Sequence, residues 1–347
     1  MSDLEKRRRL NPGDAARNVL VIKLSALGDF VMALGAMKAV RAHHPSARIT
    51  LLTTAFFKDF ATLCPYVDAV ETDGRPKGVA ATRDLITRLR KARYDIVYDF
   101  QTSNRTANYF KALNAFGRRT PLWSGHAPRA QLPHDNPDRP NMHPIDRLAD
   151  QLAYAGVGPP EGWNALTKPM PDLSWVRRNL GDRPSLQPAY FRLQEPFMLL
   201  IPGASAHRAA KRWPAERYGA LAGRIADAGV QPVIIGGTAE GQVAQDIVRA
   251  EPRVVNLVTR TDLFQIVALA EKAQFVVGND TGPMHMATLS GAPGIALFAT
   301  SESDPNKAAP RGATVIVVHG DVLDDVDVDT VWSSIQALGR LPERGPA

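Results

Sequence analysis

A carboxylate in a tight turn near the start of the chain could act as a general base. Asp29 follows Gly28 in the segment Ser25–Asp29, directly after the apolar run 19–22. Glycine permits a sharp turn and a close backbone approach, and a carboxylate placed there can take a proton from a substrate hydroxyl. Aspartate also caps exposed N–H groups at helix N-termini. The motif alone favours capping, and both roles stay open.

A second group of residues could bind a diphosphate. Pro202–Ser205 follows the apolar run 197–201, and Lys211 comes six residues after Ser205. Small residues let backbone N–H groups approach phosphate oxygens, and lysine supplies a compact positive charge. The spacing does not match a Walker A loop. A basic surface turn explains this segment equally well.

The most specific segment is Gly278–His285, a polar turn that follows the apolar run 275–277. Pro283 suits the first turn of a helix. The N–H groups at that helix start, together with Thr281, could face an incoming diphosphate. Glu240 closes the turn Gly236–Glu240 after the apolar run 232–235 and could bind ribose hydroxyls or cap the next helix.

No segment has the spacing of a complete metal site. Asp280 and His285 form only a pair, and the histidines of the segment 121–144 lack zinc spacing and a cysteine partner. The acidic segment Asp325–Asp329 is interpreted as a solvated turn, with Asp329 or a neighbour capping the last helix. We therefore expect no metal.

These residues require a framework of strands alternating with helices. In the first half, strands are predicted at 19–22, 49–52, 67–70 and 95–100, and helices at 30–44, 81–92, 106–116 and 145–155. The proline- and histidine-rich stretch 121–144 breaks the pattern and is interpreted as a long surface loop. Such alternation indicates a parallel α/β sheet.

The second half repeats the alternation after a proline-rich stretch, 159–196, that contains the linker. Strands are predicted at 197–201, 232–235, 254–258, 275–277, 295–298 and 315–318, and helices at 215–228, 241–250, 263–272, 284–290 and 328–338. We predict two Rossmann-like doubly wound domains, 1–175 and 190–347, facing a central cleft. The last helix could pack back on the first domain.

Composition is that of a globular protein, and the charge is unevenly distributed. The 347 residues are 44% hydrophobic, include one cysteine, and contain neither an apolar run long enough for a membrane span nor a secretory signal. Residues 1–173 hold 25 Lys and Arg against 17 Asp and Glu, a balance of +8, whereas residues 174–347 have 17 against 18. An anionic partner for the first half, or a solubilising surface, would explain this asymmetry.

The ordered set of segments resembles the heptosyltransferase family of lipopolysaccharide biosynthesis, which is glycosyltransferase family 9 with the GT-B fold. The segments that carry the resemblance are Ser25–Asp29, Asp99–Gln101, Pro202–Ser205 with Lys211–Pro214, Gly236–Glu240 and Gly278–His285. The resemblance covers about residues 18–338 and implies an inverting, metal-independent transfer of a heptose or related sugar from an ADP-sugar to the lipopolysaccharide inner core.

The resemblance also implies roles for individual residues. Asp29 matches the catalytic base. The residues that match the donor-binding site are Ser205, Lys211, Glu240, Asp280, Thr281, Gly282 and His285. For the anionic lipid A-core acceptor, the candidates in the basic first half are Lys58, Gln101, Arg105, Arg118, Arg119 and Arg129.

The implied partners follow from the same family. The nucleotide sugar is a substrate, so no cofactor is expected, and the enzyme is expected to be a cytoplasmic monomer held peripherally at the inner leaflet of the inner membrane. Two alternatives remain. A nucleotide-sugar epimerase of the same architecture would turn over the donor without an acceptor. A basic nucleic-acid-binding protein is disfavoured, because no recognition motif or aromatic-rich basic patch occurs.

Overall fold

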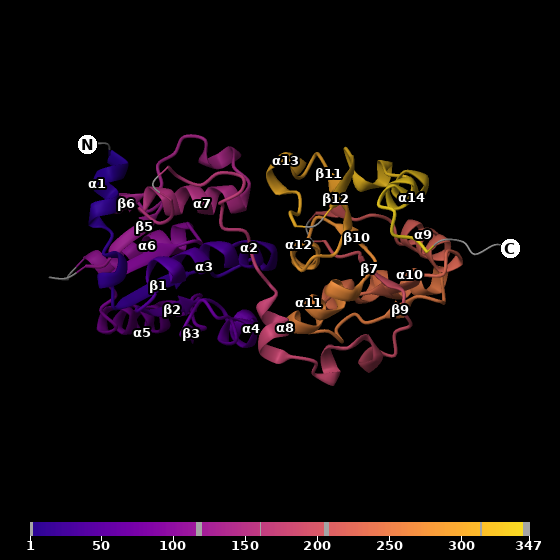
Figure 1. The fold of residues 1–347 in the computed structure, drawn as a ribbon, viewed down its shortest axis with the longest axis horizontal. Coiled ribbons are helices and arrows are strands. Elements are labelled where there is room, and N and C mark those ends of the chain that lie inside the picture. The colour runs from indigo at the N-terminus through magenta and orange to yellow at the C-terminus, as the bar shows by residue number, and fades with distance from the viewer. Residues whose placement is uncertain (1–2, 116–119, 160, 205–207, 313, 343–347) are drawn as a thin grey trace. The chain divides into compact units, whose positions relative to one another are not determined.

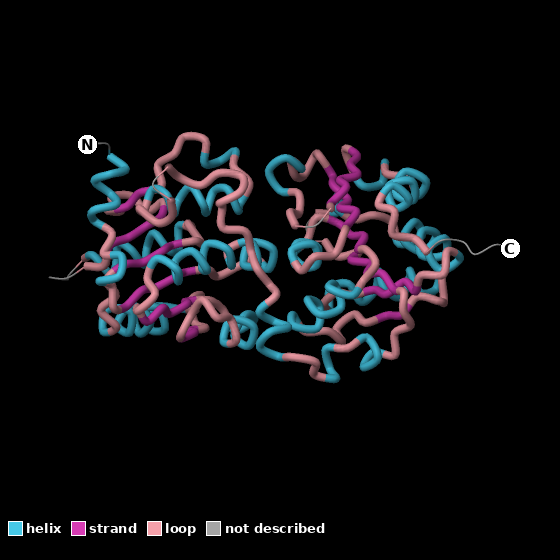
Figure 2. Tube along the Cα trace, viewed as in Figure 1, coloured by secondary structure: helices cyan, strands magenta, loops and turns pink. Residues whose placement is uncertain are grey.

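The computed structural model describes residues 3–115, 120–159, 161–204, 208–312 and 314–342. The chain divides into two compact units, Met1–Pro171 and Asp172–Ala347. Each unit holds a six-stranded parallel sheet with helices around it (Figures 1 and 2). The predicted α/β class is therefore confirmed.

The first sheet has the strand order β3-β2-β1-β4-β5-β6. Its strands are β1 (Asn18–Ile22), β2 (Arg48–Leu52), β3 (Ala69–Glu71), β4 (Ile96–Asp99), β5 (Leu122–Gly125) and β6 (Leu132–Pro133). The chain moves outward on one side of β1 and then returns to start β4 on the other. This reversal creates a topological switch point between the carboxyl ends of β1 and β4, where doubly wound sheets bind ligands.

Helices cover both faces of this sheet. They are α1 (Asp3–Leu10), α2 (Leu27–Met32), α3 (Leu34–His43), α4 (Lys58–Thr62), α5 (Gly78–Lys91), α6 (Asn104–Asn114) and α7 (Pro144–Tyr154). Helix α5 packs on α6, while α7 packs on α1, α2 and α3. The predicted helix 30–44 is two helices, α2 and α3, separated at Ala33. Because α7 contacts α2, it lies beside the turn that carries Asp29.

A buried polar network joins the N-terminal segment to this sheet. Tyr98 is fully buried, and its hydroxyl contacts His44 Nε2 at 2.8 Å and accepts from Asn11 Nδ2 at 3.0 Å. The same Asn11 amide donates to the Ala155 carbonyl at 2.6 Å. His44 Nδ1 lies 2.7 Å from the Gly13 carbonyl and therefore carries the ring proton. Burial lowers the pKa of His44 to about 4, so the ring is neutral at pH 7.

The second sheet has the order β12-β11-β10-β7-β8-β9, which is the same topology once its strands are numbered from β7. Its strands are β7 (Phe197–Ile201), β8 (Gln231–Ile234), β9 (Val255–Asn256), β10 (Val276–Asn279), β11 (Gly294–Ala299) and β12 (Val315–Gly320). The equivalent switch point lies between β7 and β10.

The helices of the second unit are α8 (Trp175–Leu180), α9 (Ala215–Asp227), α10 (Gly241–Ala250), α11 (Leu263–Lys272), α12 (Gly282–Leu289), α13 (Pro305–Ala308) and α14 (Val328–Ala337). Helix α9 packs on α10 and α14, and α11 packs on α12. The last helix, α14, also contacts β11 and β12 of its own unit. Its N-cap is Asp327, whose carboxylate accepts from Thr330 N at 2.6 Å, whereas Asp329 pairs with Arg224.

The interpretation of 121–144 as a surface loop is wrong. This stretch contains β5 and β6, and the Trp123 side chain on β5 is fully buried against Phe110. The strands are short, and their prolines concealed them in the sequence. Pro133 is tolerated because β6 lies at the edge of the sheet, where a strand needs hydrogen bonds on one side only.

Candidate active site

The predicted site residues with the clearest chemistry follow the strands at the two switch points. Asp29 and Gln101 follow β1 and β4 of the first unit, and Lys211 and Asp280 follow β7 and β10 of the second. In both sheets these are the carboxyl ends of the strands, where the topology predicts ligand binding.

The turn that carries Asp29 is fixed by Gln101. The Gln101 side-chain oxygen accepts from Leu24 N at 2.8 Å and from Ser25 N at 3.2 Å. Asp29 is half-buried, and its Oδ2 accepts from Ala26 N at 3.4 Å. The capping interaction therefore occurs, and it uses one carboxylate oxygen. Within the described part of the chain the other oxygen has no hydrogen bond, so Asp29 can also take a proton.

A buried carboxylate supports the turn after β4. Asp99 Oδ1 accepts from Gln101 N at 3.1 Å and from Thr102 N at 2.9 Å. Burial raises the pKa of Asp99 to about 6, against the opposing effect of hydrogen bonds from Thr106, Thr102 and Gln101. Asp99 thus shapes the backbone that presents Gln101, and sequence reasoning gave it no separate role.

In the second unit, Lys211 and Asp280 form a buried ion pair with an Nζ–Oδ2 distance of 2.5 Å. Their side chains are only 9% and 10% exposed, and His285 Nε2 lies 3.5 Å from the other Asp280 oxygen. Although burial disfavours its ionised form, hydrogen bonds from His285 and Lys211 hold the pKa of Asp280 below its usual value. Lys211 and Asp280, which are 69 positions apart in the sequence, thus form one charged cluster with His285.

Two polar atoms beside this pair lack partners in the described structure. They are Thr281 Oγ1 and His285 Nδ1, and both are buried. Thr281 is the residue before α12, and Gly282 and Pro283 open that helix as predicted. Free N–H groups at a helix start bind anions. The arrangement can therefore hold a diphosphate against Lys211, Thr281 and the start of α12.

Asn279, the last residue of β10, holds the neighbouring turn in place. Its amide donates to the Pro202 and Gly203 carbonyls at 2.9 and 3.1 Å, and its oxygen accepts from the Tyr218 hydroxyl at 2.9 Å. The sequence placed Asn279 inside the most specific segment but gave it no role. Its buried position at a strand end, next to Asp280, was the available signal.

Glu240 lies against two glycines at this edge. Its carboxylate accepts from Gly237 N at 2.8 Å, which is the capping role. A Cβ atom on Gly236 would lie only 2.9 Å from Glu240 Cβ, so a larger residue there would displace Glu240, whereas a Cβ atom on Gly203 would lie 3.2 Å from the movable carboxylate. Glu240 and Gly203 line a cavity of about 300 Å³ together with Ala204, Arg212 and Trp213.

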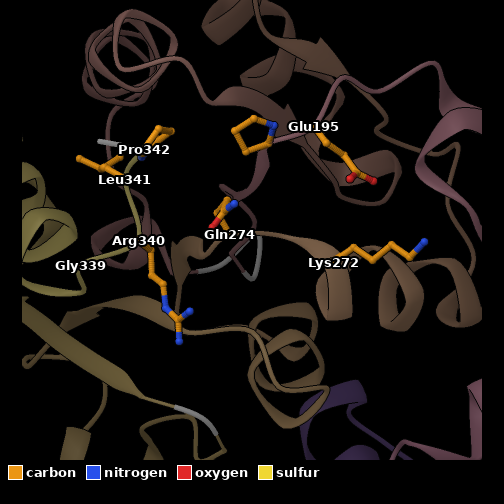
Figure 3. Close-up of a pocket in the computed structure, with 8 residues that line it drawn as sticks. Glu195, Lys272, Gln274, Gly339, Arg340, Leu341 and Pro342 are labelled. Carbon is orange, nitrogen blue, oxygen red and sulfur yellow. The ribbon is translucent and has the colours of Figure 1, made fainter. Parts of the chain in front are cut away.

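A larger cavity of about 510 Å³ lies at the opposite, amino-terminal edge of the second sheet (Figure 3). It is lined by Glu195, Pro196, Lys272, Gln274 and the segment 339–342. Glu195 and Gln274 precede β7 and β10, whereas the predicted donor residues follow these strands. None of the predicted site residues lines this cavity.

The predicted acceptor residues are placed as follows. Lys58 follows β2, Arg105 follows β4 and Arg129 lies between β5 and β6, and all three side chains are exposed. Ser205, Arg118 and Arg119 lie outside the described residues. The structure also shows three cations at the first switch point that sequence reasoning missed, namely Lys23, Arg139 and Arg147.

Neither a metal cluster nor a spanning helix occurs in the part of the chain that the structure describes. There, no three His, Cys, Asp or Glu side chains are grouped so that they could hold a metal ion. None of the helices in the same described ranges has the length and hydrophobicity needed to cross a bilayer.

Comparison with known proteins gives consistent matches. The model of glycosyltransferase family 9 (heptosyltransferase) matches residues 82–327. Lipopolysaccharide heptosyltransferase 2 of Escherichia coli K12 is 27% identical over 317 residues, which are 86% of this chain and 87% of that protein.

Solved structures share the fold. A family 9 glycosyltransferase from Veillonella parvula has a TM-score of 0.76 at 19% identity and covers 93% of this chain and 97% of its own. The E. coli ADP-heptose lipopolysaccharide heptosyltransferase II has a TM-score of 0.75 at 23% identity, with coverages of 92% and 98%. These similarities and the two sheet topologies confirm the predicted GT-B fold class.

Proposed function

Because the chain belongs to glycosyltransferase family 9, the heptosyltransferases, we propose that it moves a heptose from an ADP-sugar to the inner core of lipopolysaccharide. One observation carries the donor side of this proposal: the buried Lys211–Asp280 pair beside the start of α12, next to the cavity lined by Glu240. The relatives' names support the choice of sugar, since the E. coli enzymes are ADP-heptose and lipopolysaccharide heptosyltransferases.

We propose that the reaction is a single displacement with inversion. The acceptor oxygen attacks the anomeric carbon, its proton passes to Asp29, and the bond between that carbon and the diphosphate oxygen breaks. ADP leaves with the bonding electrons. Lys211 and the N–H groups at the start of α12 stabilise the charge on the departing diphosphate, so the reaction requires no metal.

The donor and acceptor residues divide between the two units in this proposal. Ser205, Lys211, Glu240 and the Asp280–His285 segment bind ADP-heptose. The exposed cations Lys58, Arg105 and Arg129, together with Arg118, Arg119 and Gln101, bind the anionic acceptor. The enzyme is proposed to be a monomer at the cytoplasmic side of the inner membrane, and the surplus of +8 on residues 1–173 supports its attraction to the anionic inner leaflet.

The test is a panel of nucleotide sugars and lipid A-core acceptors, with products identified by mass spectrometry. We expect one heptose to be added to an inner-core acceptor from ADP-heptose, with the opposite anomeric configuration. Isomerisation of the donor without an acceptor would instead indicate an epimerase. Steep, salt-dependent affinity for generic DNA without any transfer would indicate a nucleic-acid-binding protein.

A further inference from the structure

Three cations gather around one turn of the first unit, the segment 99–102 that follows β4. Lys23 Nζ donates to the Phe100 carbonyl at 3.3 Å, and Arg139 Nη2 donates to Thr102 Oγ1 at 2.6 Å. Arg147 lies four residues before Gln151 on α7, and Gln151 Nε2 donates to the Asp99 carbonyl at 3.1 Å. Residues four apart share a helix face, so Arg147 lies over the same turn.

Lys23 is a buried ammonium group with unused donors. Lys23 is only 5% exposed. Within the described residues, its ammonium group forms one hydrogen bond, to the Phe100 carbonyl. An ammonium group carries three N–H donors. Burial lowers the pKa of Lys23, Asp29 and Asp99 oppose this shift, and Arg147 adds to it. Lys23 is therefore close enough to all three to interact electrostatically.

The two arginines are also poorly compensated. Arg139 Nε is buried and has no hydrogen-bond partner in the described structure. Burial and the neighbouring Arg147 both lower the pKa of Arg139, and the Asp99 carboxylate only partly opposes this shift. Over the same described ranges, the Arg147 side chain has no hydrogen bond or ion pair, although its backbone N–H donates to the His143 carbonyl at the start of α7. Asp99 and Asp29 act on these cations electrostatically, but neither carboxylate forms an ion pair with any of the three in the described structure. Lys23 is buried, whereas Arg139 and Arg147 are half-buried. Buried charges are normally paired, so the cost in free energy falls mainly on Lys23 until an anion binds.

We propose that Lys23, Arg139 and Arg147 form a binding site for an oxyanion, a carboxylate or a phosphate ester, carried by the acceptor. This inference rests on the proposed function. The two guanidinium groups present planar N–H donors that match carboxylate and phosphate oxygens, and Lys23 adds a third charge. The site is assigned to the acceptor because Lys23 directly follows β1 and the proposed base, Asp29, lies in the next helix, α2, close enough to interact with Lys23 electrostatically. The donor phosphates are assigned to Lys211 in the other unit.

The test uses Arg139→Met, Arg147→Met and Lys23→Met, each of which removes charge and keeps an apolar side chain. We expect the KM for the acceptor to rise about 10- to 100-fold, which corresponds to losing one charge-assisted contact. The KM for ADP-heptose should stay unchanged. The melting temperature should stay equal or rise, because each change relieves repulsion between unpaired cations.

Arg41→Met is the matched control, because Arg41 is ion-paired with Asp68 and donates to the Ala47 carbonyl at 2.9 Å. It should lower the melting temperature and leave the acceptor KM unchanged. Arg139→Lys keeps the charge and should recover part of the acceptor affinity. If the three Met variants melt earlier but keep the parent's acceptor KM, the cations are structural and the proposal is wrong.

The source of the anion is identified with two modified acceptors, one with its carboxylates methylated and one with its phosphates removed. The group that the site binds is the one whose removal raises the parent's KM but leaves that of Arg139→Met unchanged. If neither modification has this effect, the site does not bind the acceptor.

A second measurement does not depend on transfer activity. With ADP saturating the donor site and ionic strength held constant, inorganic phosphate should raise the melting temperature of the parent and not that of the Arg139→Met, Arg147→Met double variant. Equal shifts would overturn the anion site. A phosphate effect of the expected kind in a protein that transfers no sugar would overturn the proposed function and keep the site.

Discussion

The two units have the same strand order, but the lysine at the switch point is ion-paired in the second unit and has no ion-pair partner among the described residues in the first. In the second unit Lys211 is paired with Asp280 at 2.5 Å, and His285 completes the group. In the first unit Lys23 is as deeply buried but contacts a backbone carbonyl, and Arg139 and Arg147 add further positive charge. The same scaffold thus carries one balanced and one unbalanced site.

The difference shows how a site can be prepared for its ligand in two ways. A paired lysine is held in position before the ligand binds, and its partner stays charged. Cations without an ion-pair partner instead lower the stability of the folded protein, and an anion that binds to them restores the missing interaction. Removing charge should therefore destabilise the second unit and relieve the first.

The largest effect is expected from Asp29→Asn. The amide keeps an oxygen for Ala26 N but cannot take a proton, so turnover should fall about 10²- to 10⁴-fold. ADP binding, which we assign to the second unit, should be unchanged by calorimetry. Near-normal turnover would show that the base lies elsewhere, and weaker ADP binding would contradict the division of roles between the units.

Lys211→Ala should weaken ADP binding by about 1.5–3 kcal/mol, because it removes a charge-assisted contact to phosphate. It should also lower the melting temperature, since Asp280 loses its buried partner. Acceptor binding should not change. Lys272→Ala is the control in the same unit, because Lys272 donates a hydrogen bond to Gln187 and lines the cavity at the amino-terminal edge of the second sheet. If both variants bind ADP like the parent, the donor site is misplaced.

Gln101→Glu separates two roles of the Gln101 side chain, namely holding the turn after β1 and the proposed binding of the acceptor. The carboxylate can still accept from Leu24 N and Ser25 N, but it loses the amide donors and adds negative charge near Asp29. We expect kcat/KM for the acceptor to fall about tenfold, the size of one lost neutral hydrogen bond, with little change in melting temperature. Gln101→Met should lower both. Identical behaviour of the two variants would mean that only the backbone contacts matter.

Asp99→Asn tests the electrostatics beneath the first site. The pKa of Asp99 is 3.8 in the unfolded chain, and burial in the folded protein raises it to about 6. The stabilising contribution of this group is therefore complete at low pH and is lost as the pH rises through about 6. Asn keeps the acceptor oxygen, so the variant should gain about 1–3 kcal/mol over the parent at pH 8 and nothing near pH 4. Urea unfolding at both pH values measures this difference.

The smallest expected effect is that of a chelator, because we assign charge stabilisation to Lys211 and a helix start. Activity should persist in EDTA at the level of an untreated sample. Complete loss, restored by a divalent ion, would contradict the metal-independent mechanism and would direct attention to the acidic segment Asp325–Asp329.

The sequence predicted most of this framework but little of the charge balance. Apolar runs identified buried strands closely, as for β7 at 197–201, and motifs singled out Asp29 and Asp280 as candidates, which the structure places after β1 and β10. Strands β5 and β6 were missed because prolines and histidines masked short runs whose burial depends on tertiary packing. Lys23, Arg139 and Arg147 were missed for a different reason. What distinguishes them in the described structure is the lack of an ion-paired carboxylate, and ion pairs such as Lys211–Asp280 become visible only in three dimensions.

The segment Asn11–Gly13 sets a limit on how far the chain can be shortened from its N-terminus. A truncation that ends at Leu10 removes only α1, whose Arg7 forms an ion pair with the exposed Asp135. One residue further, it deletes the amide that donates to Tyr98 and Ala155, and then the carbonyl that orients His44. Expression variants and cleavable tags should therefore join the protein before Asn11, since a later start would open the sheet's interior to water.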